Sequence, residues 1–179
     1  MQQIFVNPNQ IIGMNDYPPL HSPEALAGYY AKFKNKLFDE VAPVPLIHKS
    51  VAILYFMGCD NRFITYNQNL ERFFFENSEA EYFMLDGKHR STAAVLAGES
   101  IPCVIIWDED DVNKIHDLII SGKIPRLTGV EETLDATLET LEEHFFLYKR
   151  FWTVEEKTKA MIENGDIAAN MLEAYPFSK

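Results

Sequence analysis

The stretch of the chain richest in reactive side chains is residues 86–92, Asp-Gly-Lys-His-Arg-Ser-Thr, which follows the apolar run at 82–85. A glycine between a strand and a helix leaves the first backbone N–H groups of the helix without intrahelical acceptors, and the helix dipole adds positive charge there. Three basic side chains at that helix start oppose the dipole, so the arrangement favours a bound anion such as phosphate. The predicted phosphate-binding residues are Gly87, Lys88, His89, Arg90, Ser91 and Thr92.

Three residues are candidates for catalytic roles beside that turn. His89 would donate a hydrogen bond that strengthens as charge develops on a phosphate. Asp86 has two open readings: it braces the turn by accepting backbone hydrogen bonds, or it orients His89 or Arg90 or holds a magnesium-bound water. Glu24, near the start of the first predicted helix, is the early carboxylate to test as a base. His21 beside it either faces the same cleft or is a loop histidine without a role.

No metal site is predicted from the remaining candidate ligands. The other histidines fall in separate segments without HxxxH or HExxH spacing, and the two cysteines lie far apart without CxxC spacing. Neither a zinc site nor a disulfide framework is therefore expected. These isolated residues are His48, His116, His144, Cys59 and Cys103.

Two further clusters have a structural and a functional reading. Lys123 and Arg126 are either a solvated loop after a helix or a loop that closes over phosphates. The three phenylalanines at 73–75 are expected in the core rather than on a base-stacking platform.

The composition limits both the architecture and the partners. With 179 residues, of which 47% are hydrophobic, the chain can form one core and a helical appendage. The net charge of −11 argues against non-specific nucleic-acid binding, which depends on neutralising phosphates. The chain starts without a basic and apolar leader and has no apolar run of about 20 residues, so we expect no membrane association and a cytoplasmic location.

The elements that must position the turn follow from periodicity and from start and stop residues. An apolar run at 41–58 is consistent with one or two buried strands, and residues 60–81 hold either a hairpin or, as we favour, a helix near 70–76. Acidic first turns, glycines and a capping box at Thr153 and Glu156 mark three helices after residue 107. The other predicted elements are strands at 4–8, 82–85 and 101–107 and helices at 23–37 and 91–97.

Residues 86–90, together with Ala-Ala at 93–94 and Ile-Pro at 101–102, resemble the DGxHR signature of the ParB/sulfiredoxin superfamily. The Val-Asn-Pro at 6–8 is similar to the end of the superfamily's first strand. The helix SPEALAGYYAKF and the proline-led strand at 42–47 also have counterparts there. The resemblance covers about residues 4–107, with a longer unmatched insert between Lys49 and Glu81.

The resemblance implies an α+β fold with a small mixed sheet and packed helices at 1–107, and a helical extension at 108–179 packed on it. It also implies that the helix start after Gly87 binds nucleotide phosphates. Lys88 stands where sulfiredoxins carry their catalytic cysteine, so sulfinic acid reduction is not expected. The CTP-binding partition proteins have a further motif and a helix-turn-helix reader, and neither has a clear match here. A third branch, typified by a free-serine kinase, fits an acidic single-domain chain best.

The expected function is therefore nucleotide or phosphate binding, with ATP, ADP or CTP as ligand and with Mg²⁺. One reading is a phosphotransferase or nucleotide hydrolase that acts on a small hydroxyl substrate. The alternative is a non-catalytic, nucleotide-switched module of the partition or phage-regulator type, associated with DNA. A nuclease ranks last, because the carboxylates needed for a two-metal site are not clustered. The sequence leaves a homodimer open.

Overall fold

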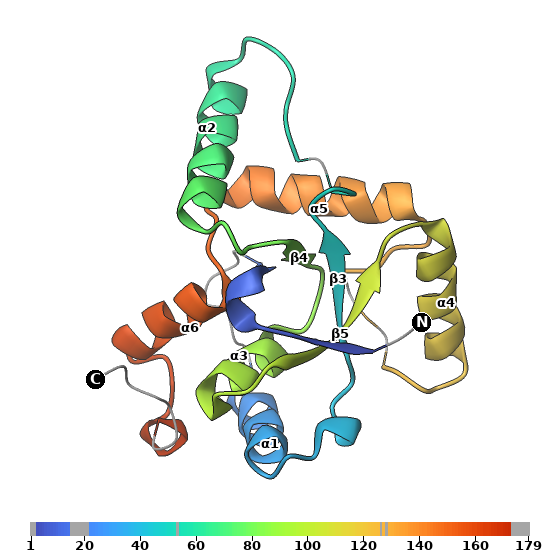
Figure 1. Cartoon of the computed structure of the whole chain (residues 1–179), viewed down its shortest axis with the longest axis vertical. Coiled ribbons are helices and arrows are strands. Elements are labelled where there is room, and N and C mark those ends of the chain that lie inside the picture. The colour runs from blue at the N-terminus through green and yellow to red at the C-terminus, as the bar shows by residue number, and fades with distance from the viewer. Residues whose placement is uncertain (1–2, 15–21, 53, 126, 128, 173–179) are drawn as a thin grey trace.

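The chain folds into three layers, with a sheet between two groups of helices (Figure 1). The computed structural model describes residues 3–14, 22–52, 54–125, 127 and 129–172. Six α-helices and one five-stranded mixed sheet lie within these residues, so the α+β class predicted from the sequence is confirmed.

The sheet has the strand order β1-β5-β3-β4-β2. β3 pairs parallel with β5, and β2 pairs parallel with β4, whereas the β1–β5 and β3–β4 pairs are antiparallel. The two longest strands, β3 and β5, therefore lie side by side in the middle of the molecule (Figure 1). The strands are β1 (Ile4–Val6), β2 (Ile11–Ile12), β3 (Val44–His48), β4 (Tyr82–Met84) and β5 (Ile101–Ile106).

Each face of the sheet is covered by three helices, as Figure 1 shows. One core lies under α1 (Pro23–Lys34), α3 (Lys88–Ala97) and α6 (Val154–Glu163). The other core lies under α2, α4 and α5. The bounds of these last three helices are Asn61–Glu76 for α2, Glu109–Ile120 for α4 and Leu134–Tyr148 for α5. Three short 3₁₀ turns occur at Pro8–Gln10, Phe38–Glu40 and Ala169–Met171.

The central strands are apolar on both sides because neighbouring residues of a strand point to opposite faces. Leu46 of β3 joins the core of α1, α3 and α6, and the next residue, Ile47, joins the core of α2, α4 and α5. Met84 and Phe83 of β4 divide in the same way. A continuous apolar run is thus the correct signature of these strands, as predicted.

Capping side chains start α1, α4 and α6 where the sequence predicts, whereas α3 begins at Lys88, before the predicted start at 91, without a side-chain cap. The Ser22 hydroxyl accepts a hydrogen bond from the Ala25 backbone N–H at 3.2 Å, with proline at the first position of α1. Asp108 caps α4, and Thr153 and Glu156 form the predicted capping box of α6.

Residues 49–81 depart most from the prediction. α2 is longer than the helix expected near 70–76, because the Asp60 carboxylate caps it at Arg62 and Tyr66 extends its buried face. The apolar run after β3 does not form a second strand within its described residues. Instead the side-chain amide of Asn67 donates to the Phe56 carbonyl at 2.8 Å and accepts from the Phe56 N–H at 3.1 Å, which ties this segment to α2.

The helices after residue 107 share both cores with the rest of the chain. Val154 and Met161 of α6 pack in the same core as α1 and α3, while Leu141 and Phe145 of α5 pack in the opposite core. The aromatic run at 73–75 divides: Phe73 is buried in that second core, Phe74 is half-buried, and Phe75 is 88% exposed. Removing the C-terminal helices would therefore expose both faces of the sheet.

Candidate phosphate-binding site

The chain turns from β4 into α3 at Gly87, which is the N-cap of the helix. Gly87 has φ of +106°, a conformation that favours glycine. A Cβ atom at this position would lie 2.8 Å from Cγ2 of Val44, closer than side chains can approach. The glycine is therefore required by the bend and by packing against β3, whether or not a ligand approaches the backbone.

Asp86 braces this bend with both carboxylate oxygens. Its Oδ1 accepts a hydrogen bond from the Gly87 backbone N–H at 2.6 Å, and its Oδ2 accepts from Nη2 of Arg90 at 3.3 Å. The Asp86 side chain is 24% exposed. The Gly87 contact fits the first interpretation of Asp86, bracing the turn, and the Arg90 contact fits one part of the second, orienting Arg90.

Arg90 is used to hold the turn against the segment before β3. Its Nη1 donates to the carbonyl oxygens of Ala42 at 2.9 Å and Pro43 at 2.7 Å, and its side chain is only 6% exposed. Burial lowers the pKa of the Arg90 guanidinium, and the Asp86 carboxylate opposes that shift. A direct contact between Arg90 and a phosphate would require the guanidinium to leave these acceptors.

The side of α3 that carries the two hydroxyls faces α6. Ser91 and Thr92 are buried, and the Ser91 hydroxyl donates to the Lys88 carbonyl at 3.1 Å. The gap between them and Val154 and Lys157 of α6 is about 10 Å³, roughly the space of one water molecule. The Nζ of Lys157 donates to the Met14 carbonyl, and this hydrogen bond holds the Lys157 side chain beside the gap. A ligand would therefore reach the turn from another side.

Asp86, Lys88 and His89 are each partly exposed, but Lys88 also lines the gap beside Ser91 and Thr92, and the Nε2 atom of His89 is buried. Gly87 supplies no side-chain acceptor to the N–H groups of the first turn of α3. The predicted phosphate-binding residues thus divide into two sets. Lys88 and His89 are partly exposed, and Gly87, Arg90, Ser91 and Thr92 are buried.

The remaining predicted residues do not gather at the turn within the described part of the chain. Glu24 is exposed in the first turn of α1 and has no hydrogen bond or ion pair to any described residue. Lys123 is exposed in the loop after α4. His21 and Arg126 lie outside the described residues.

The sequence does not predict that the loop at Gly129 packs against the chain just before the turn. A Cβ atom on Gly129 would lie 1.9 Å from the Leu85 carbonyl oxygen, so this loop packs directly on the backbone beside Asp86. The Thr-Gly dipeptide at 128–129 is the local indication of a special position, but it does not say which strand the glycine meets. The carbonyls of Ala42 and Pro43 were also missed, because backbone acceptors leave no trace in residue type.

The isolated histidines and cysteines have structural neighbours. The ring of His48 stacks on Trp107 at 4.7 Å, Nε2 of His116 is 2.7 Å from the Glu131 carbonyl oxygen, and the ring of His144 lies 4.9 Å from Tyr148. Over the described ranges, no group of three or more His, Cys, Asp or Glu side chains is placed to hold a metal ion. Cys103 is buried and Cys59 is exposed.

Comparisons of the chain with protein-family models, with curated proteins and with solved structures found no match. The resemblance to the ParB/sulfiredoxin superfamily therefore stays a prediction from residues 86–102 and the segments before them. In the part of the chain that the structure describes, no helix combines the length and the apolar character needed to cross a membrane.

Proposed function

We propose that the chain binds a nucleotide or another phosphate-bearing ligand at the start of α3 and transfers or hydrolyses one of its phosphoryl groups. The observation that supports this most is the Gly87 N-cap, which offers no side-chain acceptor to the first turn of a helix that begins with the partly exposed cations Lys88 and His89. Backbone N–H groups and cations in such a position suit phosphate oxygens.

In this proposal the residues of the turn have different tasks. Lys88, His89 and the backbone N–H groups of the first turn contact the phosphate. Asp86 and Arg90 keep the bend in shape through their contacts with Gly87 and with the carbonyls before β3. The sequence predicts that Arg90 contacts the ligand, whereas in this proposal Arg90 is a positioning residue.

The proposed chemistry is electrostatic. Phosphoryl transfer needs mainly positioning and stabilisation of charge on the transferred group. A hydrogen bond from His89 would strengthen as that charge develops, and Lys88 would act as a movable counter-charge. Mg²⁺ accompanies nucleotides through their own phosphate oxygens and usually one or two carboxylates, and Asp86 is the carboxylate of this turn.

A second candidate is a module that binds the nucleotide without consuming it. Both carboxylate oxygens of Asp86 already accept hydrogen bonds from the turn, and Glu24 has no hydrogen bond or ion pair with the described residues there. Neither carboxylate is therefore placed to act as a base in this conformation. That observation supports a nucleotide-controlled switch as the second candidate, with the helices after residue 107 as its partner surface.

Titration calorimetry with ATP, ADP and CTP, with and without Mg²⁺, tests the shared part of both candidates. We expect one nucleotide to bind, and Lys88→Ala and His89→Ala each to weaken it by about tenfold. Lys34→Ala, on the exposed end of α1, is the matched control and should change nothing. Absence of binding by all three nucleotides would refute the proposal. Release of inorganic phosphate then separates the enzyme from the switch.

A further inference from the structure

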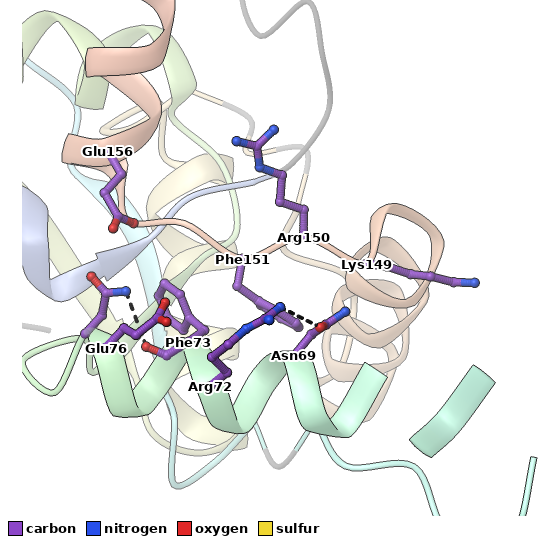
Figure 2. A pocket seen from close by; sticks show the side chains of 9 residues that line it. Asn69, Arg72, Phe73, Glu76, Lys149, Arg150, Phe151 and Glu156 are labelled. Carbon is purple, nitrogen blue, oxygen red and sulfur yellow. Dashed lines mark hydrogen bonds between the residues drawn. The ribbon is translucent and has the colours of Figure 1, made fainter. Parts of the chain in front are cut away.

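A separate hollow of about 180 Å³ lies between α2 and the segment that joins α5 to α6 (Figure 2). It is smaller than the pockets of about 300–1,000 Å³ that hold drug-sized ligands, so its volume suits a ligand of amino-acid size. Side chains from one helix and from a distant linker meet here. The residues that the argument uses are Asn69, Arg72, Phe73, Glu76, Phe151 and Glu156.

The floor of the hollow is apolar and well supported. The rings of Phe73 and Phe151 lie 5.9 Å apart, and Phe151 stacks on Phe145 at 5.3 Å with an interplanar angle of 10°. Phe73 and Phe145 are buried in the core of α2, α4 and α5. The floor is therefore part of the folded core and can receive the apolar part of a ligand.

The walls carry charges of both signs that do not pair with each other. Arg72 and Glu76 are four residues apart on α2, a spacing that allows an ion pair, yet none joins them in the described structure. Nη2 of Arg72 instead donates to Oδ1 of Asn69 at 2.9 Å, as Figure 2 shows. Across the hollow, Glu156 uses Oε2 to accept from the Thr153 N–H at 2.8 Å, which leaves its Oε1 available.

The two other cations of the lining each lie close to an aromatic ring. The guanidinium of Arg150 lies 3.8 Å over the ring of Trp152, and Nζ of Lys149 lies 5.6 Å from the ring of Phe146. In Figure 2 the Lys149 side chain points away from the hollow. The charged groups of the lining without such a ring contact are therefore one guanidinium and two carboxylates, those of Arg72, Glu76 and Glu156.

We propose that this hollow binds a small zwitterion of the α-amino-acid class. The ligand carboxylate pairs with Arg72, whose planar guanidinium suits a carboxylate. The ligand ammonium pairs with Glu76 and Glu156, and its side chain rests on Phe73 and Phe151. In this arrangement α2 supplies a cation and an anion that are not paired with each other, and Glu156 supplies a second anion from the other side of the hollow. The inference uses no residue of the phosphate-binding turn and does not depend on its ligand.

Calorimetry on the full chain with glycine and five L-amino acids as probes tests this site. The probes are glycine, serine, leucine, phenylalanine, glutamate and lysine, each at concentrations up to about 10 mM to detect millimolar Kd values. We expect at least one to bind, and its methyl ester and its N-acetyl derivative each to bind about tenfold more weakly. Arg72→Gln and Glu76→Gln should have effects of the same size. Both side chains are exposed, so these variants should fold.

Arg62→Gln is the matched control, because Arg62 lies on the same helix but pairs with Asp60. It should leave the affinity unchanged. The inference is overturned if none of the probes binds, if the N-acetyl derivative binds as well as the free amino acid, or if Arg72→Gln and Arg62→Gln behave alike. Binding of inorganic phosphate in competition with the amino acid would also overturn it, since the hollow would then be an anion site.

Discussion

The carboxylate of Asp86 and the guanidinium of Arg90, one helical turn apart, meet at 3.3 Å across the bend between β4 and α3. Each also holds the backbone: Asp86 binds the Gly87 N–H, and Arg90 binds the carbonyls of Ala42 and Pro43. The pair therefore joins the start of α3 to the chain just before β3. Two of the most reactive side chains of the sequence are used to build the turn.

Arg90→Ala is expected to lower the free energy of unfolding by about 2–4 kcal/mol, because two carbonyls and the Asp86 carboxylate lose a buried donor. Urea denaturation measures the change. Arg62→Ala is the control, since Arg62 pairs with Asp60 at the surface and should cost less than about 1 kcal/mol. Equal losses for the two variants would contradict the structural role of Arg90.

The local order around this turn could be predicted from the sequence. A short apolar run, a glycine and an alanine-rich segment each produce their element by backbone preference and periodicity, and β4, α3 and β5 follow in that order. The caps at Ser22, Asp108 and Thr153 were predictable for the same reason, since a cap bonds to residues two or three positions away.

Which side chains of the turn are buried and which stay exposed could not be predicted, because this depends on contacts between distant segments. Arg90 finds its acceptors 47 and 48 residues earlier in the chain, and Lys157 of α6 closes the space beside Ser91 and Thr92. Any backbone carbonyl can accept from an arginine, so no residue type marks the partner. The sequence therefore indicates that cations gather at the turn but not which of them remain accessible.

Two glycine substitutions should act in opposite directions. Gly129→Ala is expected to destabilise the protein by about 2 kcal/mol or more, because the new Cβ would lie 1.9 Å from the Leu85 carbonyl oxygen and the loop must move. Gly28→Ala is expected to stabilise it by about 0.5–1 kcal/mol, because this residue lies within α1 with no atom within 4 Å of the added Cβ. Thermal unfolding of both variants checks the signs. A Gly129→Ala protein as stable as the parent would show that the loop does not pack on the backbone of Leu85, just after β4.

Tyr66→Phe is expected to stabilise the protein by about 1 kcal/mol, since the buried Tyr66 hydroxyl has no hydrogen-bond partner among the described residues. Burial, together with the charge of Glu142, raises the pKa of Tyr66 above its ordinary value of 10.0. Because the pKa is raised, the folded chain keeps the Tyr66 proton at a pH where the unfolded chain loses it. The stability that comes from this difference in proton binding is complete below pH 10.0 and is lost as the pH rises beyond it.

The variant should therefore lose less stability than the parent as the pH rises from about 8 to about 11, where tyrosine titrates in the unfolded chain. Urea midpoints over that range test this. Burial also raises the pKa of the Cys103 thiol above its ordinary value of 9.0. A fall in stability that begins above pH 9.0 should therefore persist in Tyr66→Phe and weaken in Cys103→Ala. Parallel curves for the parent and Tyr66→Phe would contradict the prediction.

Asp60 should titrate at unusually low pH. Its side-chain hydrogen bonds with Arg62, supported by the Arg62 backbone N–H at the start of α2, lower the pKa of Asp60 from 3.8 to about 2. A lowered pKa stabilises the folded chain above pH 3.8, and this contribution is lost as the pH falls through about 2. An NMR titration of the Asp60 carboxyl measures the value directly. Arg62→Gln should raise the pKa of Asp60 part of the way back, since the backbone N–H remains, and the more weakly acting Lys149→Gln should raise it less. If the pKa of Asp60 is unchanged in Arg62→Gln, the side-chain pair does not form in solution.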